Sequence, residues 1–291
     1  MLASGPMSEP RYYRPNTISE ALTILSGEGP DARPLGGGTD LMVRIRAGLL
    51  RPKVLVDIGR IGLDTIHPAG DAVVIGAMCT MAQLQRDATA TRHLPALAQA
   101  ASRVGANQIQ HMATVGGNVC NASPAADTAC ALVALEARVM LRTVGGVRSL
   151  PIGEFLRGPG ATALEPGELL EAFSIPLPAQ DPAAHQSFNK VGGRNALVCS
   201  LAAVAGMTRI VDGLVQSCNL ALAAVGPTCM RPGRAEALVT GEALTDELCR
   251  TAAAAAAAES QPIDDHRATG EYRRRLVAAL VREHLVECME P

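Results

Sequence analysis

Aromatic residues are nearly missing from this chain of 291 residues, which has no tryptophan, three phenylalanines and three tyrosines. Proteins that bind single-stranded nucleic acid stack its bases on aromatic side chains, so that platform is missing here. A dominant charge is missing too, because 26 basic residues stand against 28 acidic ones and the formal net charge is −2. The sequence therefore argues against nucleic acid or an anionic membrane as a partner.

Long hydrophobic runs are also absent. No window approaches the roughly 18 apolar residues that a membrane helix needs. The run at 252–258 is an alanine tract in a helical pattern. Residues 1–10 lack the basic and apolar regions of a signal peptide. We expect a cytoplasmic protein with no membrane span.

Patterns for metal binding or nucleophilic catalysis are missing as well. The cysteines form no C-x-x-C pair or short-range cluster, and the histidines are widely spaced. We interpret all the cysteines as small, buried, reduced apolar residues, and expect no catalytic residue and no metal ligand. The residues concerned are Cys79, Cys120, Cys130, Cys199, Cys218, Cys229, Cys249 and Cys288, with His67, His93, His111, His185, His266 and His284.

Helix and strand patterns are interspersed along the chain, which predicts an α+β fold. A stretch with three prolines, 176–184, is the best candidate for a linker. We place the units at 7–62, 63–178 and 185–289. Strands are expected at 33–35, 54–58, 138–143, 147–152, 169–175, 198–210 and 214–225. Hairpins are expected at 66–75 and, around Val144-Gly145-Gly146, at 138–152, and an Asp-Gly turn at 212–213 should join the last two strands. The polar segment 16–20 offers capping groups for a first helix that ends near 27–30, and further helical segments are expected at 40–47, 81–87, 94–104, 128–135, 231–240, 245–259 and 269–287.

The first glycine-rich loop follows the strand at 33–35. Gly36, Gly37 and Gly38 can adopt conformations closed to residues with a Cβ, so their N–H groups can converge on an anion. Thr39 adds a hydroxyl and opens a helix. A few charge-assisted bonds, each worth roughly 1.5–3 kcal/mol, could hold a pyrophosphate without a basic side chain. The alternative is a tight glycine turn with no ligand.

The second glycine-rich loop surrounds Gly116 and Gly117 with small hydroxyl and amide side chains. Two such loops in two subdomains suggest a ligand held between them. The alternative, a structural turn before a helix capped by Asp127, leaves the small polar groups unexplained. The third glycine of a Rossmann fingerprint is missing from the first loop, and the P-loop pattern G-x-x-x-x-G-K-[ST] does not occur in the chain.

Together these motifs resemble the FAD-binding medium subunit of the molybdenum hydroxylases, the family of carbon monoxide dehydrogenase medium chains and xanthine oxidase flavin domains. The resemblance rests on the segment 35–41, on the segment 113–127, and on Phe188-Asn189-Lys190 with Arg194, in the family's order. It covers nearly the whole chain. It implies a vanillyl-alcohol-oxidase-type (PCMH-type) FAD-binding fold of two α+β subdomains, followed by a small C-terminal α+β domain.

The resemblance also implies which residues line FAD. The first loop would bind the pyrophosphate, later strands would approach the cofactor, and Val104 stands where xanthine oxidase has an aromatic residue beside the flavin. Lys190 could stabilise reduced flavin or be a surface lysine on a strand, and relatives have paired arginines where this chain has Gly193-Arg194. The implied residues are Leu35, Gly36, Gly37, Gly38, Thr39, Asp40, Val104, Thr114, Gly116, Gly117, Asn118, Asp127, Leu170 and Lys190.

The function implied by the resemblance is that of an electron-carrying subunit. A large subunit with a molybdenum-pterin cofactor would oxidise substrate, and a small subunit with [2Fe-2S] clusters would relay electrons to FAD in this chain, in a dimer of heterotrimers. The external acceptor stays open among NAD, oxygen, a quinone and a cytochrome. The alternatives are a stand-alone flavin oxidoreductase of the same fold and a flavin-free scaffold subunit.

Overall fold

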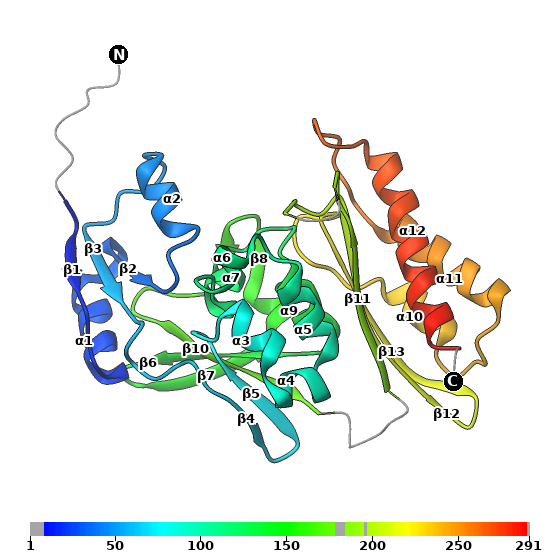
Figure 1. The fold of residues 1–291 in the computed structure, drawn as a ribbon, viewed down its shortest axis with the longest axis horizontal. Coiled ribbons are helices and arrows are strands. Elements are labelled where there is room, and N and C mark those ends of the chain that lie inside the picture. Colours follow the sequence, from blue (N-terminus) through cyan, green and yellow to red (C-terminus); the bar gives the residue numbers. More distant parts are fainter. Residues whose placement is uncertain (1–8, 178–183, 195–196, 290–291) are drawn as a thin grey trace.

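The computed structural model describes residues 9–177, 184–194 and 197–289. Their strands form four sheets. Figure 1 shows three units that lie one after another along the longest axis, in the order of the chain. Each unit combines a β-sheet with helices, as the predicted α+β architecture requires.

The first unit is a parallel three-stranded sheet with a helix against it. Its strand order is β1-β3-β2, so β3 has a neighbour on each side. The predicted cap of α1 is confirmed, because the Thr17 side chain accepts a hydrogen bond from the N–H of Glu20. Leu22 and Leu25 of that helix are buried with Val54. The elements are β1 (Arg11–Tyr13), α1 (Ile18–Glu28), η1 (Gly29–Asp31), β2 (Ala32–Leu35), α2 (Leu41–Arg46) and β3 (Val54–Asp57).

The second unit is built on an antiparallel sheet of order β4-β5-β10-β6-β7, with a separate two-stranded sheet, β8-β9. Both predicted hairpins, β4-β5 and β6-β7, are confirmed. The elements are β4 (Ile66–Ala69), β5 (Ala72–Gly76), α3 (Met81–Arg86), α4 (Ala88–His93), α5 (Pro95–Ser102), α6 (Asn107–Gln110), α7 (Val115–Cys120), α8 (Asp127–Ala134), β6 (Arg138–Thr143), β7 (Gly146–Pro151), α9 (Ile152–Phe155), β8 (Leu156–Gly158), β9 (Ala161–Thr162) and β10 (Leu169–Pro176).

The third unit is an antiparallel sheet of order β11-β12-β13 followed by three helices. Its predicted Asp-Gly turn is confirmed, since Asp212 and Gly213 both have positive φ angles, 52° and 78°. The elements are β11 (Ala184–Val191), β12 (Ala202–Val211), β13 (Leu214–Ala223), α10 (Gly233–Val239), α11 (Asp246–Glu259) and α12 (Gly270–Glu287).

The C-terminal sheet is covered on both faces. Helices α5 and α8 pack on one face and α10 and α12 on the other, with α11 behind them (Figure 1). Ala205 and Ala221 belong to the core shared with the second unit, whereas Val204 and Leu220 belong to the core under the C-terminal helices. A strand buried on both faces has a continuous apolar sequence, and residues 202–207 of β12 show this.

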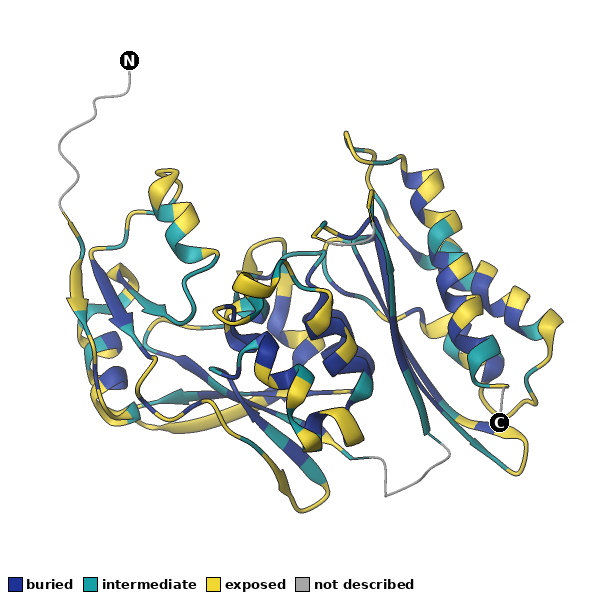
Figure 2. Ribbon diagram, viewed as in Figure 1, coloured by how far each residue is buried: buried dark blue, intermediate teal, exposed yellow. Residues whose placement is uncertain are grey.

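Helix α2, like the short α6, is among the least buried of the described helices. This helix contains no buried residue, and Figure 2 shows it standing out from the first unit with teal and yellow surfaces only. By contrast, every residue of α8 is buried. Among the described helices, none is long and apolar enough to cross a membrane.

Several elements differ from the sequence-based predictions. The strands β1 and β11 and the helices α4 and α9 were not predicted, and β12 begins at Ala202 rather than at 198. Most of the predicted linker, 178–183, lies outside the described residues. The prediction that all cysteines are buried is wrong for Cys199, which is exposed, and for Cys120 and Cys288, which are only partly buried.

Candidate functional site

The first glycine segment leaves β2 at its carboxyl end and forms an open loop. The carbonyl of Leu35 accepts a hydrogen bond from Ile58 N (3.0 Å), which closes the sheet, and the carbonyl of Gly38 accepts one from Met42 N (3.1 Å), which starts α2. Among the described residues, no partner accepts a hydrogen bond from the N–H groups of residues 36–39. Gly38 has a φ of +72°, which only glycine adopts without strain.

This loop meets the second glycine segment backbone to backbone. A Cβ on Gly37 would lie 1.6 Å from the carbonyl oxygen of Met112, and a Cβ on Gly36 would lie 3.2 Å from Thr114 Oγ1. No side chain fits at Gly37 without moving one of the two segments. The structure thus brings the two predicted motifs together, although they are far apart in the chain.

The second glycine segment is a helix start, which corrects the expectation of a loop. Thr114 is the N-cap of α7, and its Oγ1 accepts a hydrogen bond from Gly117 N (3.1 Å). Val115 N donates to the carbonyl of Cys79 and Gly116 N to that of Ala77, both at 2.9 Å. These three N–H groups are therefore engaged within the protein.

Gly116 lets this helix start dock against a neighbouring segment. A Cβ on Gly116 would lie 2.7 Å from both the Cβ and the carbonyl oxygen of Ala77, closer than real Cβ contacts. Thr114 also forms an isolated bridge with Thr80, which the sequence did not single out. Close approach of backbone to backbone explains this glycine without any ligand.

Asp127 begins α8 but does not cap it, which corrects the alternative interpretation of this residue. The N-cap is Ala126, and it makes no side-chain capping bond. Asp127 Oδ2 instead accepts a hydrogen bond from Lys190 Nζ (2.6 Å), and Oδ1 accepts one from Ser200 Oγ (2.8 Å). Burial raises the pKa of Asp127 above its ordinary value, and Lys190 opposes that shift.

Lys190 lies on β11 with its side chain largely buried, so the interpretation as a surface lysine is wrong. Its side chain is 8% exposed, and Nζ also donates to the carbonyls of Arg103 (2.9 Å) and Val198 (3.3 Å). It thereby joins the C-terminal sheet to the end of α5 and the start of α8. Sequence reasoning missed Arg103 and Ser200 in this cluster, because nothing in their local sequence marks them.

The remaining predicted residues lie around these two groups. Asn118 Oδ1 accepts a hydrogen bond from Thr128 Oγ1 (2.6 Å), which links α7 to α8 beside Asp127. Val104 is half-buried directly after Arg103. Leu170 is buried in the core of the second unit on β10, so its side chain is a packing group. Asp40 is exposed ahead of α2.

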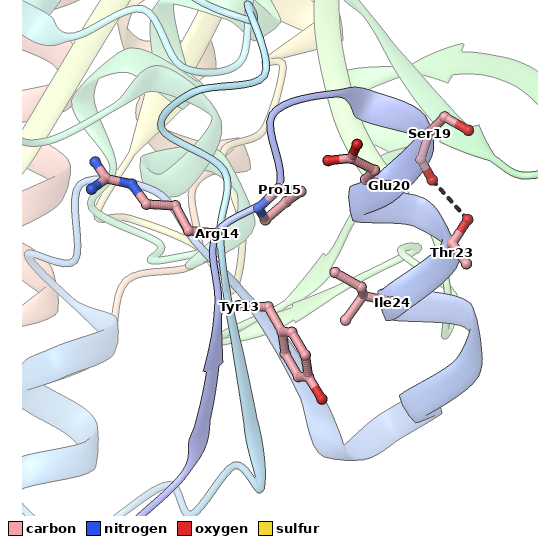
Figure 3. Close-up of a pocket in the computed structure, with 7 residues that line it drawn as sticks. All are labelled: Tyr13, Arg14, Pro15, Ser19, Glu20, Thr23 and Ile24. Carbon is pink, nitrogen blue, oxygen red and sulfur yellow. Dashed lines mark hydrogen bonds between the residues drawn. The ribbon is translucent and has the colours of Figure 1, made fainter.

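Two surface cavities lie elsewhere. One, of about 420 Å³, lies between β1 and the start of α1, and Figure 3 shows Tyr13 and Ile24 facing each other across it. The other, of about 380 Å³, lies between α5 and β11 and ends at Glu287. The residues that line them include none of the predicted cofactor residues. The glycine loop is therefore a candidate site because of its backbone N–H groups and not because it lines a cavity.

Comparison with known proteins identifies the family. The model of the FAD binding domain in molybdopterin dehydrogenase matches residues 6–178, and that of the CO dehydrogenase flavoprotein C-terminal domain matches residues 187–288. The xanthine dehydrogenase FAD-binding subunit of Escherichia coli O157:H7 is 31% identical over 280 residues, covering 96% of this chain and 95% of the relative. The carbon monoxide dehydrogenase medium chain of Afipia carboxidovorans is 32% identical over 272 residues, 93% of each.

Solved structures agree with this relationship. Carbon monoxide dehydrogenase from Hydrogenophaga pseudoflava superposes with a TM-score of 0.92 at 30% identity, covering 98% of this chain and 99% of that one. Quinoline 2-oxidoreductase from Pseudomonas putida 86 gives a TM-score of 0.90 at 25% identity, with 98% of each chain covered. Both the predicted fold class and the predicted resemblance are confirmed, and this chain belongs to the family of FAD-binding medium subunits of the molybdenum hydroxylases.

Proposed function

We propose that the loop of residues 36–39 holds the diphosphate of FAD. The observation that carries the proposal is the row of N–H groups without a partner among the described residues, next to a glycine where no Cβ fits. Convergent backbone N–H groups bind phosphate oxygens without a basic side chain. This suits a chain of near-neutral charge. Leu35 and Asp40 flank the diphosphate in this proposal.

The second glycine segment takes a different part in the proposed site. Because its N–H groups are engaged, we propose that Thr114, Gly116 and Gly117 shape the opposite wall of the FAD site through close packing. Asn118 and Val104 complete that wall, and Leu170 supports it from the core.

Lys190 and Asp127 have a positioning role in this proposal. The lysine charge is already matched by a buried carboxylate 2.6 Å away, so it is not a free cation for reduced flavin. The pair instead fixes the end of α5, where Val104 follows, relative to the C-terminal sheet. FAD in proteins accepts single electrons and releases them singly or in pairs, while the protein supplies binding and orientation.

The electron path follows from the family. We propose that this chain receives electrons from [2Fe-2S] clusters of a small subunit, that a large subunit with a molybdenum-pterin cofactor oxidises the substrate, and that the complex is a dimer of heterotrimers working in the cytoplasm. Medium chains similar over 93–98% of this chain support the multi-subunit assembly.

Glycine substitutions at similar φ angles test the FAD site. Gly38→Ala places a Cβ where φ is +72°, 3.2 Å from Met42 Cγ and 3.3 Å from Leu35 Cδ1, and Gly48→Ala places one where φ is +70°, in open space after α2. Loss of one charge-assisted bond, worth roughly 1.5–3 kcal/mol, weakens FAD binding by about 10–100-fold in the first variant. The second variant should bind FAD as the wild type does. Equal affinity in both variants would refute the proposed diphosphate site.

Co-purification tests the assembly separately. A tagged chain expressed with its native partners should bring down two further chains, one carrying molybdenum and one carrying iron and labile sulfide, and the complex should show flavin absorption. A lone chain that turns over substrate without partners would contradict the subunit proposal while leaving the FAD site untouched.

A further inference from the structure

Three potential metal ligands converge in the C-terminal unit, far from the proposed FAD loop. His284 and Cys288 lie one helical turn apart at the end of α12, and His185 lies on β11. One ligand atom from each of the three lies within 4.8 Å of the other two. His284 Nε2 and Cys288 Sγ are 3.8 Å apart, close to the edge of a tetrahedron built on Zn–N of about 2.0–2.1 Å and Zn–S of about 2.3 Å.

The surroundings of His284 match those of a ligand imidazole. Its ring is 1% exposed, and Nδ1 lies 2.7 Å from Ser187 Oγ, which can accept the Nδ1–H and leave Nε2 free to ligate. Thr208 Oγ1 lies 2.9 Å from Nε2 but also 3.4 Å from Cys218 Sγ, so this hydroxyl has another acceptor.

The sheet makes room for this imidazole. A Cβ on Gly206 of β12 would lie 2.3 Å from both Cε1 and Nε2 of His284, so only glycine fits opposite the ring. A glycine in the middle of a buried strand weakens the strand. Its presence here is explained by the ring that it admits.

His185 connects the cluster to solvent. It lies on the wall of the 380 Å³ cavity between α5 and β11, together with Ser187 and Glu287. His185 Nε2 is 3.3 Å from Glu287 Oε2, so the carboxylate can orient the imidazole as carboxylates do for metal-binding histidines. The cavity offers an entry path and a position for water.

We propose that His185, His284 and Cys288 bind a zinc-class divalent cation that ties the end of α12 to β11, with its fourth position open to the cavity. Neutral imidazoles and a thiolate are the donors that such a cation prefers. On binding, the Cys288 thiol loses its proton to solvent and its sulfur bonds to the metal. Uptake therefore releases a proton and weakens as the pH falls.

Metal uptake by the reduced full-length chain tests this site. Zn²⁺ is measured by equilibrium dialysis and elemental analysis, and Co²⁺ by its thiolate charge-transfer band in difference spectra. The wild type and Cys199→Ser, which removes an exposed thiol outside the cluster, should each bind one ion per chain. Ser187→Ala should bind about 10–100-fold more weakly, and Cys288→Ser and His185→Gln more weakly still.

The spectrum separates ligation from a structural effect. Cys288→Ser should lose the charge-transfer band, and His185→Gln should keep it at high Co²⁺ because the thiolate remains. Both variants are first shown to keep the wild-type far-ultraviolet circular dichroism. No ion bound by the wild type, or equal binding by the wild type and Cys288→Ser, would overturn the site.

Discussion

The loop at 36–39 and the helix start at 114–117 have similar sequences, glycines beside a threonine, but they differ in what their backbones do. In the first, no described residue accepts a hydrogen bond from the four N–H groups. In the second, the N–H groups of Val115, Gly116 and Gly117 all have partners within the protein. Close packing explains glycines in both segments, at Gly37 and at Gly116, but only the first segment has backbone donors left over for the proposed ligand.

Whether a glycine motif can bind an anion depends on whether its backbone N–H groups already have acceptors within the protein. A buried or inward-facing N–H group needs an acceptor, and a loop that supplies none is ready for one from a ligand. Adjacent glycines beside a threonine predict a phosphate loop in both segments, although only the first has backbone donors without a partner among the described residues. The predictions below act on this difference, from the largest effect to the smallest.

Removing the charge of Lys190, the partner of Asp127, should have the largest effect on stability. Lys190→Met leaves Asp127 buried without its partner, which costs about 3–5 kcal/mol of the free energy of unfolding at neutral pH. Chemical denaturation of the purified chain measures this loss. A loss below about 1 kcal/mol would show that the pair does not hold the C-terminal sheet on α5 and α8.

The pH dependence of this variant has a definite sign. The folded pKa of Asp127 is already raised by burial, and loss of Lys190 raises it further. The folded state then binds a proton that the unfolded state lacks, so the variant should regain stability relative to the wild type as the pH falls through the folded pKa toward the unfolded value. Denaturation at several pH values tests this, and a gap that widens with falling pH would contradict it.

Gly37→Val should damage the contact between the two segments. Its Cβ would overlap the carbonyl oxygen of Met112, so we expect a loss of up to about 3 kcal/mol in stability together with loss of FAD. Thermal melting measures the loss of stability, and an unchanged melting temperature would show that the two segments do not pack as tightly as this contact indicates.

Gly116→Ala probes packing at the second segment. The added methyl group meets Ala77 at 2.7 Å, which should cost about 1–3 kcal/mol in the free energy of unfolding. FAD affinity at low temperature, where the variant is folded, should fall much less than in Gly38→Ala. A stable Gly116→Ala chain that cannot hold FAD would break the comparison, since it would place ligand contacts at both segments.

Thr114→Val should give the smallest effect. It removes the side-chain acceptor for Gly117 N and costs about 0.5–2 kcal/mol of stability, as losses of N-caps do. Thr114→Ser keeps the hydroxyl and is the matched control. Thermal melting of the two variants checks the difference, and equal melting temperatures would show that the cap contributes nothing.

Much of the fold could be predicted from local signals. The cap at Thr17, the Asp-Gly turn at 212–213 and the helical spacing of α12 all correspond to observed elements. The strand β1 was missed because three polar and aromatic residues, Arg11–Tyr13, carry no apolar alternation. Such a strand is set by pairing with β3, which is a tertiary effect.

The site was predicted less completely, for a physical reason. Gly116 and Gly117 are poor helix formers, so the sequence suggested a loop where docking against Ala77 stabilises a helix start. Lys190 and Ser200 meet Asp127 only through the packing of β11 on α8. Local sequence holds no signal for such distant contacts, although resemblance to the family placed Lys190 among the site residues.

The central claim is that the first loop, and not the second segment, binds the diphosphate. The most direct measurement is the ratio of FAD to riboflavin affinity for the apoprotein, because riboflavin shares the flavin ring but has no phosphate. Gly38→Ala should lower this ratio by about 10–100-fold, while Gly48→Ala and Gly116→Ala should leave it unchanged. A ratio that falls in Gly116→Ala and not in Gly38→Ala would contradict the account.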